Sequence, residues 1–228
     1  MRLIIAATVA TVMTVTPLLA ADDEPVKRLE TAAAVLSEIM AAPDKGIPED
    51  LLENAHCVVI APELKAAAFV VGAKYGKGYL TCRRKGGGWS APATIRIEGG
   101  SVGFQIGASS TDVVMLVMNE RGADKLLSSQ FTLGGEGSVA AGPVGRKATA
   151  QTDAQMNAEI LSWSRSQGLF AGVALTGATL RQDLDDNAAL YGKPLESRTI
   201  VMEGVAPPAA AAKLLAVLNK YSFKEKKD

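Results

Sequence analysis

The 228-residue sequence contains a single histidine, two cysteines and only 5% aromatic residues. The histidine, His56, lies inside the apolar run "AHCVVIAP", and neither a Ser-His-Asp nor a Cys-His catalytic arrangement can be argued from it. The segment "SRSQG" lacks the leading glycine of a nucleophile elbow. We therefore expect a protein that is not an enzyme and that uses no cofactor.

An excess of charge of either sign is also absent. The chain has 24 basic and 24 acidic side chains, for a formal net charge of zero. A dedicated nucleic-acid-binding protein normally carries a basic excess, so we do not expect nucleic acid as a partner. An apolar content of 48% is typical of a compact globular protein rather than a disordered one.

An uncharged apolar run, "LIIAATVATVMTVTPLLA", follows Arg2 and ends in small residues ahead of two aspartates. This pattern is typical of a secretory signal peptide, which we place at residues 1–21. The alternative is an uncleaved membrane anchor, which the threonines and Pro17 of the run disfavour. We expect cleavage after Ala20 or Ala21 and a periplasmic or secreted mature protein.

The two cysteines then face an oxidising compartment. Cys57 and Cys82 each lie in a strand-like segment, and an intervening pair of runs could bring them together. We predict a disulfide between them, which would stabilise the fold by about 3 kcal/mol. The alternative is a pair of buried free thiols.

The hydrophobic pattern changes period along the chain. Residues 23–41 are predicted to form an amphipathic helix, and "PEDLLENA" a second short helix. Short apolar runs then follow as far as residue 119, with glycines at 76–78, 86–88 and 99–100, and they predict short antiparallel strands joined by turns. Farther on we expect a helix around "ERGADKLLSS", a strand at "QFTLGG", two strands around Gln167–Gly168, a helix over "ATLRQDLDDNAALYG" and a C-terminal helix after Pro208.

These elements predict an α+β fold. We expect a single domain with a curved antiparallel β-sheet or barrel-like core and packed N- and C-terminal helices. Residues 22–50 form the N-terminal helix region and residues 51–228 the main domain with its C-terminal helix. The apolar stripe of helix 23–41 could pack on the protein's own sheet, pair with a partner helix, or contact lipid.

A glycine-rich stretch at 131–150, "FTLGGEGSVAAGPVGRKATA", is similar in composition to a phosphate-binding loop. Pro143 stands where a Walker A motif has lysine. Gly135, Gly137 and Ala140 have the spacing of a dinucleotide-binding fingerprint, but the residues after them cannot start the helix that this motif requires. We interpret the glycines as sites of close backbone approach. In "DLDDNA", residues 183–188, Ala188 replaces the glycine of a calcium loop and Pro194 its glutamate, so we expect the polar face of a helix and no metal site.

One charge pattern points to a partner. No acidic residue lies between Glu63 and Glu98, and tyrosine and tryptophan alternate there with the basic residues Lys65, Lys74, Lys77, Arg83, Arg84, Lys85 and Arg96. Such a segment suits an anionic membrane surface, where each cation contributes about 1 kcal/mol. The alternative is a solvated strand face balanced by acids from elsewhere. The candidate lipid-binding residues are Lys74, Lys77, Arg83, Arg84, Lys85, Arg146 and Lys147, and for Arg146 a structural role is the alternative.

Several motifs then agree in order and spacing with a known family. "WSAPATIRI", "GGSVGFQIGASSTDVVMLVMN", "AAGPVGRKATA" and "SRSQGLFAGVALTGA" strongly resemble the SYLF-domain family, over about Leu51 to Gly192. The resemblance implies a phosphoinositide- and membrane-binding module in eukaryotic members, some of which bind actin, and a lipid-binding protein in exported bacterial members.

From this resemblance and the leader we expect a periplasmic protein that binds anionic phospholipid through a basic surface, without actin as a partner. The alternative is a structural or stress-related envelope protein that binds another protein, of unknown identity, through helix 23–41.

Overall fold

A computed structural model describes residues 24–42, 46–144, 157–166, 169–172 and 175–222. The predicted leader at 1–21, and Arg146 and Lys147, lie outside the described residues. Within the described part of the chain, no helix is both long enough and apolar enough to cross a membrane.

Two strands dominate the sheet and are much longer than the sequence predicts. β1 runs over Cys57–Cys82, 26 residues, and β2 over Ala93–Val117, 25 residues. They pair antiparallel along their lengths to form a ribbon, with register shifts between Ala61 and Leu64 and between Phe69 and Val71. The prediction of several short strands is therefore wrong, because the glycines at 76–78 and 99–100 lie inside strands. Only the glycines at 86–88 lie in the connection between β1 and β2.

The β1–β2 ribbon folds back on itself. A fully extended strand of this length would span about 85 Å, yet the Cα atoms of Cys57 and Cys82 are 3.9 Å apart and the two residues form the predicted disulfide. Gly78 explains how the two halves of β1 lie so close, since a Cβ atom there would be 2.7 Å from the Cα of Ala61. Glycine here permits close packing of backbone rather than a turn.

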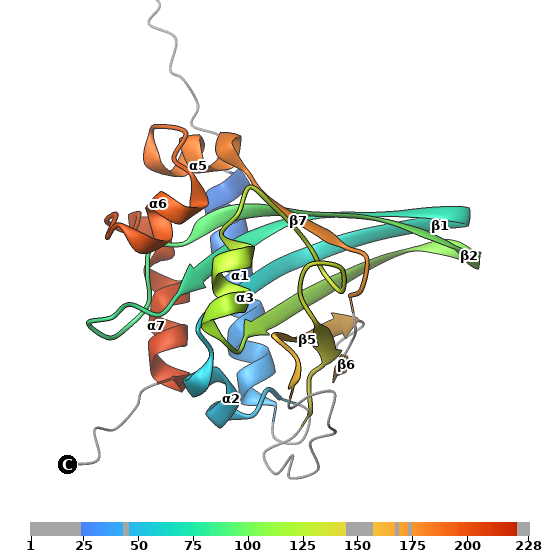
Figure 1. Cartoon of the computed structure of the whole chain (residues 1–228), viewed down its shortest axis with the longest axis horizontal. Coiled ribbons are helices and arrows are strands. Elements are labelled where there is room, and N and C mark those ends of the chain that lie inside the picture. Colours follow the sequence, from blue (N-terminus) through green and yellow to red (C-terminus); the bar gives the residue numbers. More distant parts are fainter. Residues whose placement is uncertain (1–23, 43–45, 145–156, 167–168, 173–174, 223–228) are drawn as a thin grey trace, which may run out of the picture.

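Short strands extend this ribbon into a curled sheet (Figure 1). β5 (Ile160–Ser166) and β7 (Thr179–Gln182) pair antiparallel with opposite ends of β2. β3 (Gln130–Thr132) pairs with β7, and β6 (Leu169–Gly172) pairs with β5. β4 (Val139–Ala141) pairs with β5 in parallel, whereas the other pairs among the described strands are antiparallel. The predicted α+β fold with a curved sheet is confirmed.

Helices cover both faces of the sheet because alternate strand residues point to opposite sides. Val58 and Ile60 join a core with α1 (Glu24–Ala41), α2 (Glu49–Asn54) and α7 (Ala212–Tyr221). Val59 and Ala61 join a second core inside the curl, with residues of α3 (Glu120–Leu126) and α6 (Ser197–Met202). The segment predicted as one helix at 178–192 divides into β7 and α5 (Leu184–Tyr191), and α6 was not predicted.

The apolar stripe of α1 packs on the protein itself. Leu29, Leu36 and Ile39 are buried in the core that α1 shares with α7 and the sheet. The interpretation that the stripe covers the protein's own sheet is confirmed. The stripe is thus already occupied, so it does not offer the surface that binding of a partner helix would require.

Candidate functional site

The predicted basic residues that the structure describes do not form one surface. Arg84 and Lys85 are exposed on the loop that joins β1 to β2, whereas Lys74 lies partly exposed near the far end of the ribbon. Lys77 and Arg83 are engaged in contacts inside the protein. Because strand residues advance by about 3.3 Å each, the loop and the far end of the ribbon are separate sites.

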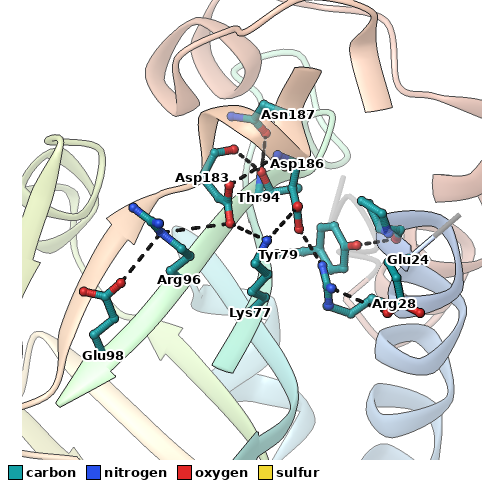
Figure 2. A network of polar contacts seen from close by, with 11 residues as sticks. Glu24, Arg28, Lys77, Tyr79, Thr94, Arg96, Glu98, Asp183, Asp186 and Asn187 are labelled. Carbon is teal, nitrogen blue, oxygen red and sulfur yellow. Dashed lines mark hydrogen bonds and ion pairs between the residues drawn. The ribbon is translucent and has the colours of Figure 1, made fainter. Parts of the chain in front are cut away.

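Lys77 belongs to a partly buried charge network (Figure 2). Its Nζ lies 2.9 Å from Asp183 Oδ2 and 2.7 Å from Asp186 Oδ1. Arg28 of α1 donates from Nη1 to the other oxygen of Asp186 at 2.6 Å. Asp183 is the N-cap of α5, where its side chain accepts a hydrogen bond from the backbone of Asp186. The network therefore ties α1, β1 and α5 together.

The network keeps its cations charged. Burial alone would lower the pKa of Lys77, but the hydrogen bonds and charges of Asp186 and Asp183 raise that pKa above its ordinary value. Burial also acts to lower the pKa of Arg28, but Tyr79 and Asp186 raise that pKa above its ordinary value. The acids of "DLDDNA" thus serve as a helix cap and as counterions, two of them buried rather than on a solvated face. Among the described residues, no group of three His, Cys, Asp or Glu side chains is placed to hold a metal ion.

Arg83 anchors the loop between β1 and β2. Its guanidinium donates to the carbonyls of Leu52 and Glu53, at 3.1 and 3.0 Å, and to that of Ser222 at 3.1 Å. It also stacks on the Trp89 ring, 4.3 Å from the centroid. These carbonyls end α2 and α7, where a cation is favoured by the helix dipoles. Burial lowers the pKa of Arg83.

The far end of the ribbon carries the most distinctive surface. A hollow of about 590 Å³ is lined there by Lys65, Ala66, Ala67, Ala73, Tyr75, Ala108, Ser109 and Ser110. Tyr75 is 47% exposed, and Ala67, Ala73 and Ala108 are also exposed. Figure 1 shows the ribbon extending away from the helices at this end. An exposed surface of small apolar residues with a tyrosine and lysines is suited to the interface of a membrane.

The sequence of the ribbon beyond this hollow is apolar as well. It reads "AFVVG" in β1 and "SVGFQIG" in β2, and the two segments pair with each other, Phe69 opposite Ile106 and, after the register shift, Val71 opposite Val102. Residues 64–75 and 99–111 contain no aspartate or glutamate. Among the described residues, neither Lys65 nor Lys74 has an ion-pair partner. We call residues 64–75 and 99–111 the ribbon end.

The glycine-rich stretch serves packing where the structure describes it. Gly142 lies against the indole of Trp163, whose Nε1 donates to the carbonyl of Pro143 at 2.8 Å. A Cβ atom at Gly137 would lie 2.9 Å from a carboxylate oxygen of Glu159. These positions agree with close backbone approach and not with a phosphate-binding loop.

Sequence reasoning gave Lys65 no role as a site residue, although it noted the absence of acids around it. The acid-free basic segment already included Lys65. Only the pairing of Lys65 with Ser110 across the ribbon shows which residues line the hollow with it. Sequence reasoning also missed Arg28 as the partner of Asp186, since 158 positions separate them along the chain.

Comparison with known proteins places these features in a family. The family model for Ysc84, described as "Las17-binding protein actin regulator", matches residues 98–221. An SH3 domain-containing protein of Schizosaccharomyces pombe is 39% identical over 181 residues, which cover 78% of this chain and 42% of that protein. LAS seventeen-binding protein 3 of Saccharomyces cerevisiae is 36% identical over 184 residues, covering 79% of this chain and 40% of the relative.

A mammalian relative is similar over a comparable share of this chain. SH3 domain-containing YSC84-like protein 1 of Mus musculus is 34% identical over 183 residues, covering 80% of this chain and 54% of the relative. The chain thus spans about half or less of the length of these three relatives.

Proposed function

The chain belongs to the Ysc84, or SYLF-domain, family, and from this premise we propose that it is an exported, non-enzymatic protein that binds anionic phospholipid surfaces through the ribbon end. The resemblance seen in the sequence is confirmed at the level of the family. Export rests on the pattern of residues 1–21, and the mode of binding rests on the ribbon end.

The observation that carries the proposal is the combination of exposure, apolar character and charge at the ribbon end. Its described side chains include an exposed tyrosine and exposed alanines beside a hollow. Lys65 and Lys74 flank an uninterrupted apolar sequence, with no acid to repel an anionic surface. An exposed apolar patch of this kind marks an interaction site rather than ordinary surface.

The magnitudes show that both parts of the surface are needed. Two lysines near an anionic bilayer contribute about 2 kcal/mol together, too little for stable attachment. Each methylene group buried among acyl chains contributes about 0.8 kcal/mol. Insertion of the apolar ribbon end therefore supplies most of the free energy of binding, and the lysines supply the preference for anionic headgroups.

The family description names Las17 and actin, and the name of one relative refers to LAS seventeen. These partners are not part of the proposal. The match covers only part of each relative. A protein exported by its leader would not meet cytosolic actin. Nor does the proposal use α1, because its apolar face is already buried.

Co-sedimentation of the protein with vesicles tests the proposal. We expect stronger binding to vesicles of phosphatidylcholine with phosphatidylglycerol than to phosphatidylcholine alone. The variant Lys65→Glu/Lys74→Glu should bind the anionic vesicles at least tenfold more weakly, because two attractions become repulsions. The matched control Arg121→Glu/Lys193→Glu makes the same charge change at exposed residues on other elements and should bind within threefold of the original protein.

A second pair of variants separates insertion from charge attraction. Ala67→Asp and Ala108→Asp place a carboxylate on exposed positions at the hollow. Both should weaken binding to either vesicle while leaving the thermal unfolding midpoint unchanged. Equal and negligible binding of the original protein to both vesicles, or equal loss in the control variant, would overturn the proposal.

A further inference from the structure

A cleft of about 460 Å³ lies beside the loop between β1 and β2. One wall is the loop itself with Arg84 and Lys85, and the others are the chain after α2, with His56, and the end of α7, with Asn219. We infer that this cleft binds a small soluble anion that bears phosphate groups.

The loop that carries the cations is held in place at both ends. Arg83 is fixed by carbonyls at the ends of α2 and α7. At the other end of the loop, Trp89, four residues before β2 begins, donates from Nε1 to Ser222 Oγ at 2.9 Å. Arg84 also donates its backbone N–H to the carbonyl of Gly88 at 3.1 Å across the turn. A loop ordered in advance loses little conformational entropy when it binds a ligand.

The charges of the cleft favour an anion. Arg84 and Lys85 are exposed, and neither has an ion-pair partner among the residues that the structure describes. Glu53 is the acidic residue of the lining. Its charge lies near Arg83, whose pKa it acts to raise, so Arg83 offsets it. Glu203 lines a neighbouring hollow together with Arg84 and Lys85 but forms no ion pair with either. The lining of the cleft itself therefore keeps a net positive charge.

The donor types favour phosphate. An arginine side chain presents a planar fork of N–H groups that matches two phosphate oxygens, and lysine adds a compact charge. His56 and Asn219 line the same cleft, and their side chains are of types that can donate further hydrogen bonds. A volume of this size holds a small molecule. The cleft thus suits a phosphate ester or a pyrophosphate group.

The position of the cleft points to a soluble ligand rather than a lipid headgroup. The loop and the ribbon end lie at opposite ends of the molecule (Figure 1). Residues 71–84 of an extended chain cover about 40 Å. A flat bilayer that contacts the ribbon end would not reach the cleft. Binding of a phosphate-bearing anion rests on the cleft alone, whereas the choice of a soluble ligand over a lipid headgroup rests on the proposed membrane contact of the ribbon end.

Isothermal titration calorimetry of the mature protein with inorganic pyrophosphate tests the inference. We expect saturable binding at one site. The variant Arg84→Gln/Lys85→Gln should bind pyrophosphate at least tenfold more weakly, with an unchanged thermal midpoint because both side chains are exposed. The control Arg121→Gln/Lys193→Gln removes the same charge elsewhere and should bind like the original protein.

Vesicle binding by the same variants separates the two sources of phosphate. The Arg84→Gln/Lys85→Gln variant should bind phosphatidylglycerol vesicles like the original protein. Absence of saturable pyrophosphate binding, or equal weakening in the control variant, would overturn the inference. A loss of vesicle binding as large as that caused by Lys65→Glu/Lys74→Glu would overturn its assignment to a soluble ligand.

Discussion

Cys57 and Cys82 are the first and last residues of a single strand, and a disulfide joins them across the fold of the β1–β2 ribbon. The bond closes the ribbon at its base, where β1 begins and ends. Both cysteines are buried in the core inside the curl. The disulfide therefore fixes the base from which the ribbon end extends.

Removal of this bond should lower stability without preventing folding. The variant Cys57→Ala/Cys82→Ala loses a constraint on the unfolded chain worth about 3 kcal/mol, while the hydrogen bonds between β1 and β2 remain. Urea unfolding should show a lower midpoint and a single transition. The disulfide should also resist dithiothreitol in the native state, since both sulfurs are buried. Two titratable thiols in the denatured, unreduced protein would contradict the pairing.

The charge network around Lys77 should make stability depend on alkaline pH. The pKa of Lys77 is raised in the folded protein above its ordinary value of 10.5, so from about that pH upward the folded state holds a proton that the unfolded state releases. The free energy of unfolding should fall as pH rises through this range and should be fully retained below it. The variant Lys77→Met should show a shallower fall above about pH 10.5, the ordinary pKa of lysine, when urea unfolding is measured at several pH values.

Lys77→Met should also be less stable at neutral pH. The change leaves Asp183 and Asp186 buried with fewer counterions, which costs about 3 kcal/mol or more. Arg84→Met, at an exposed residue, serves as the control and should change stability by less than about 0.5 kcal/mol. Equal stability of the two variants would contradict the role assigned to the network.

A glycine inside β1 and a glycine in the loop that follows it should respond differently to the same substitution. Gly78→Ala places a Cβ atom 2.7 Å from the Cα of Ala61, in a place where backbone must move. We expect a loss of about 1–3 kcal/mol. Gly86→Ala, in the loop, meets no atom within 4 Å and should change stability little. Thermal unfolding of the two variants compares them directly, and equal midpoints would show that the halves of β1 are not packed as described.

Local pattern was enough to predict much of the fold. The three-and-four spacing of apolar residues located α1, and the glycines at 86–88 located the connection between β1 and β2. The expected oxidising compartment, together with the strand-like segments around the two cysteines, predicted the disulfide that the structure contains. Motifs in fixed order indicated the family, which the match over residues 98–221 confirms.

The length of the strands could not be predicted in the same way. Glycine in a strand pattern indicates a turn by its local preference, yet Gly76 and Gly78 are needed because another part of β1 lies against them. That contact exists only after the ribbon has folded back. Contact between distant segments outweighs local propensity here, so several expected short strands are two long ones.

The sequence by itself determined the class of fold, the family, the disulfide and the presence of an acid-free basic segment. Tertiary structure alone decided how each cation of that segment is used. Lys77 meets Asp183 and Asp186, which lie more than 100 positions away, and Arg83 meets the ends of α2 and α7. The physical reason is that charge follows from composition, whereas neutralisation and exposure follow from which distant groups the fold brings within a few ångströms.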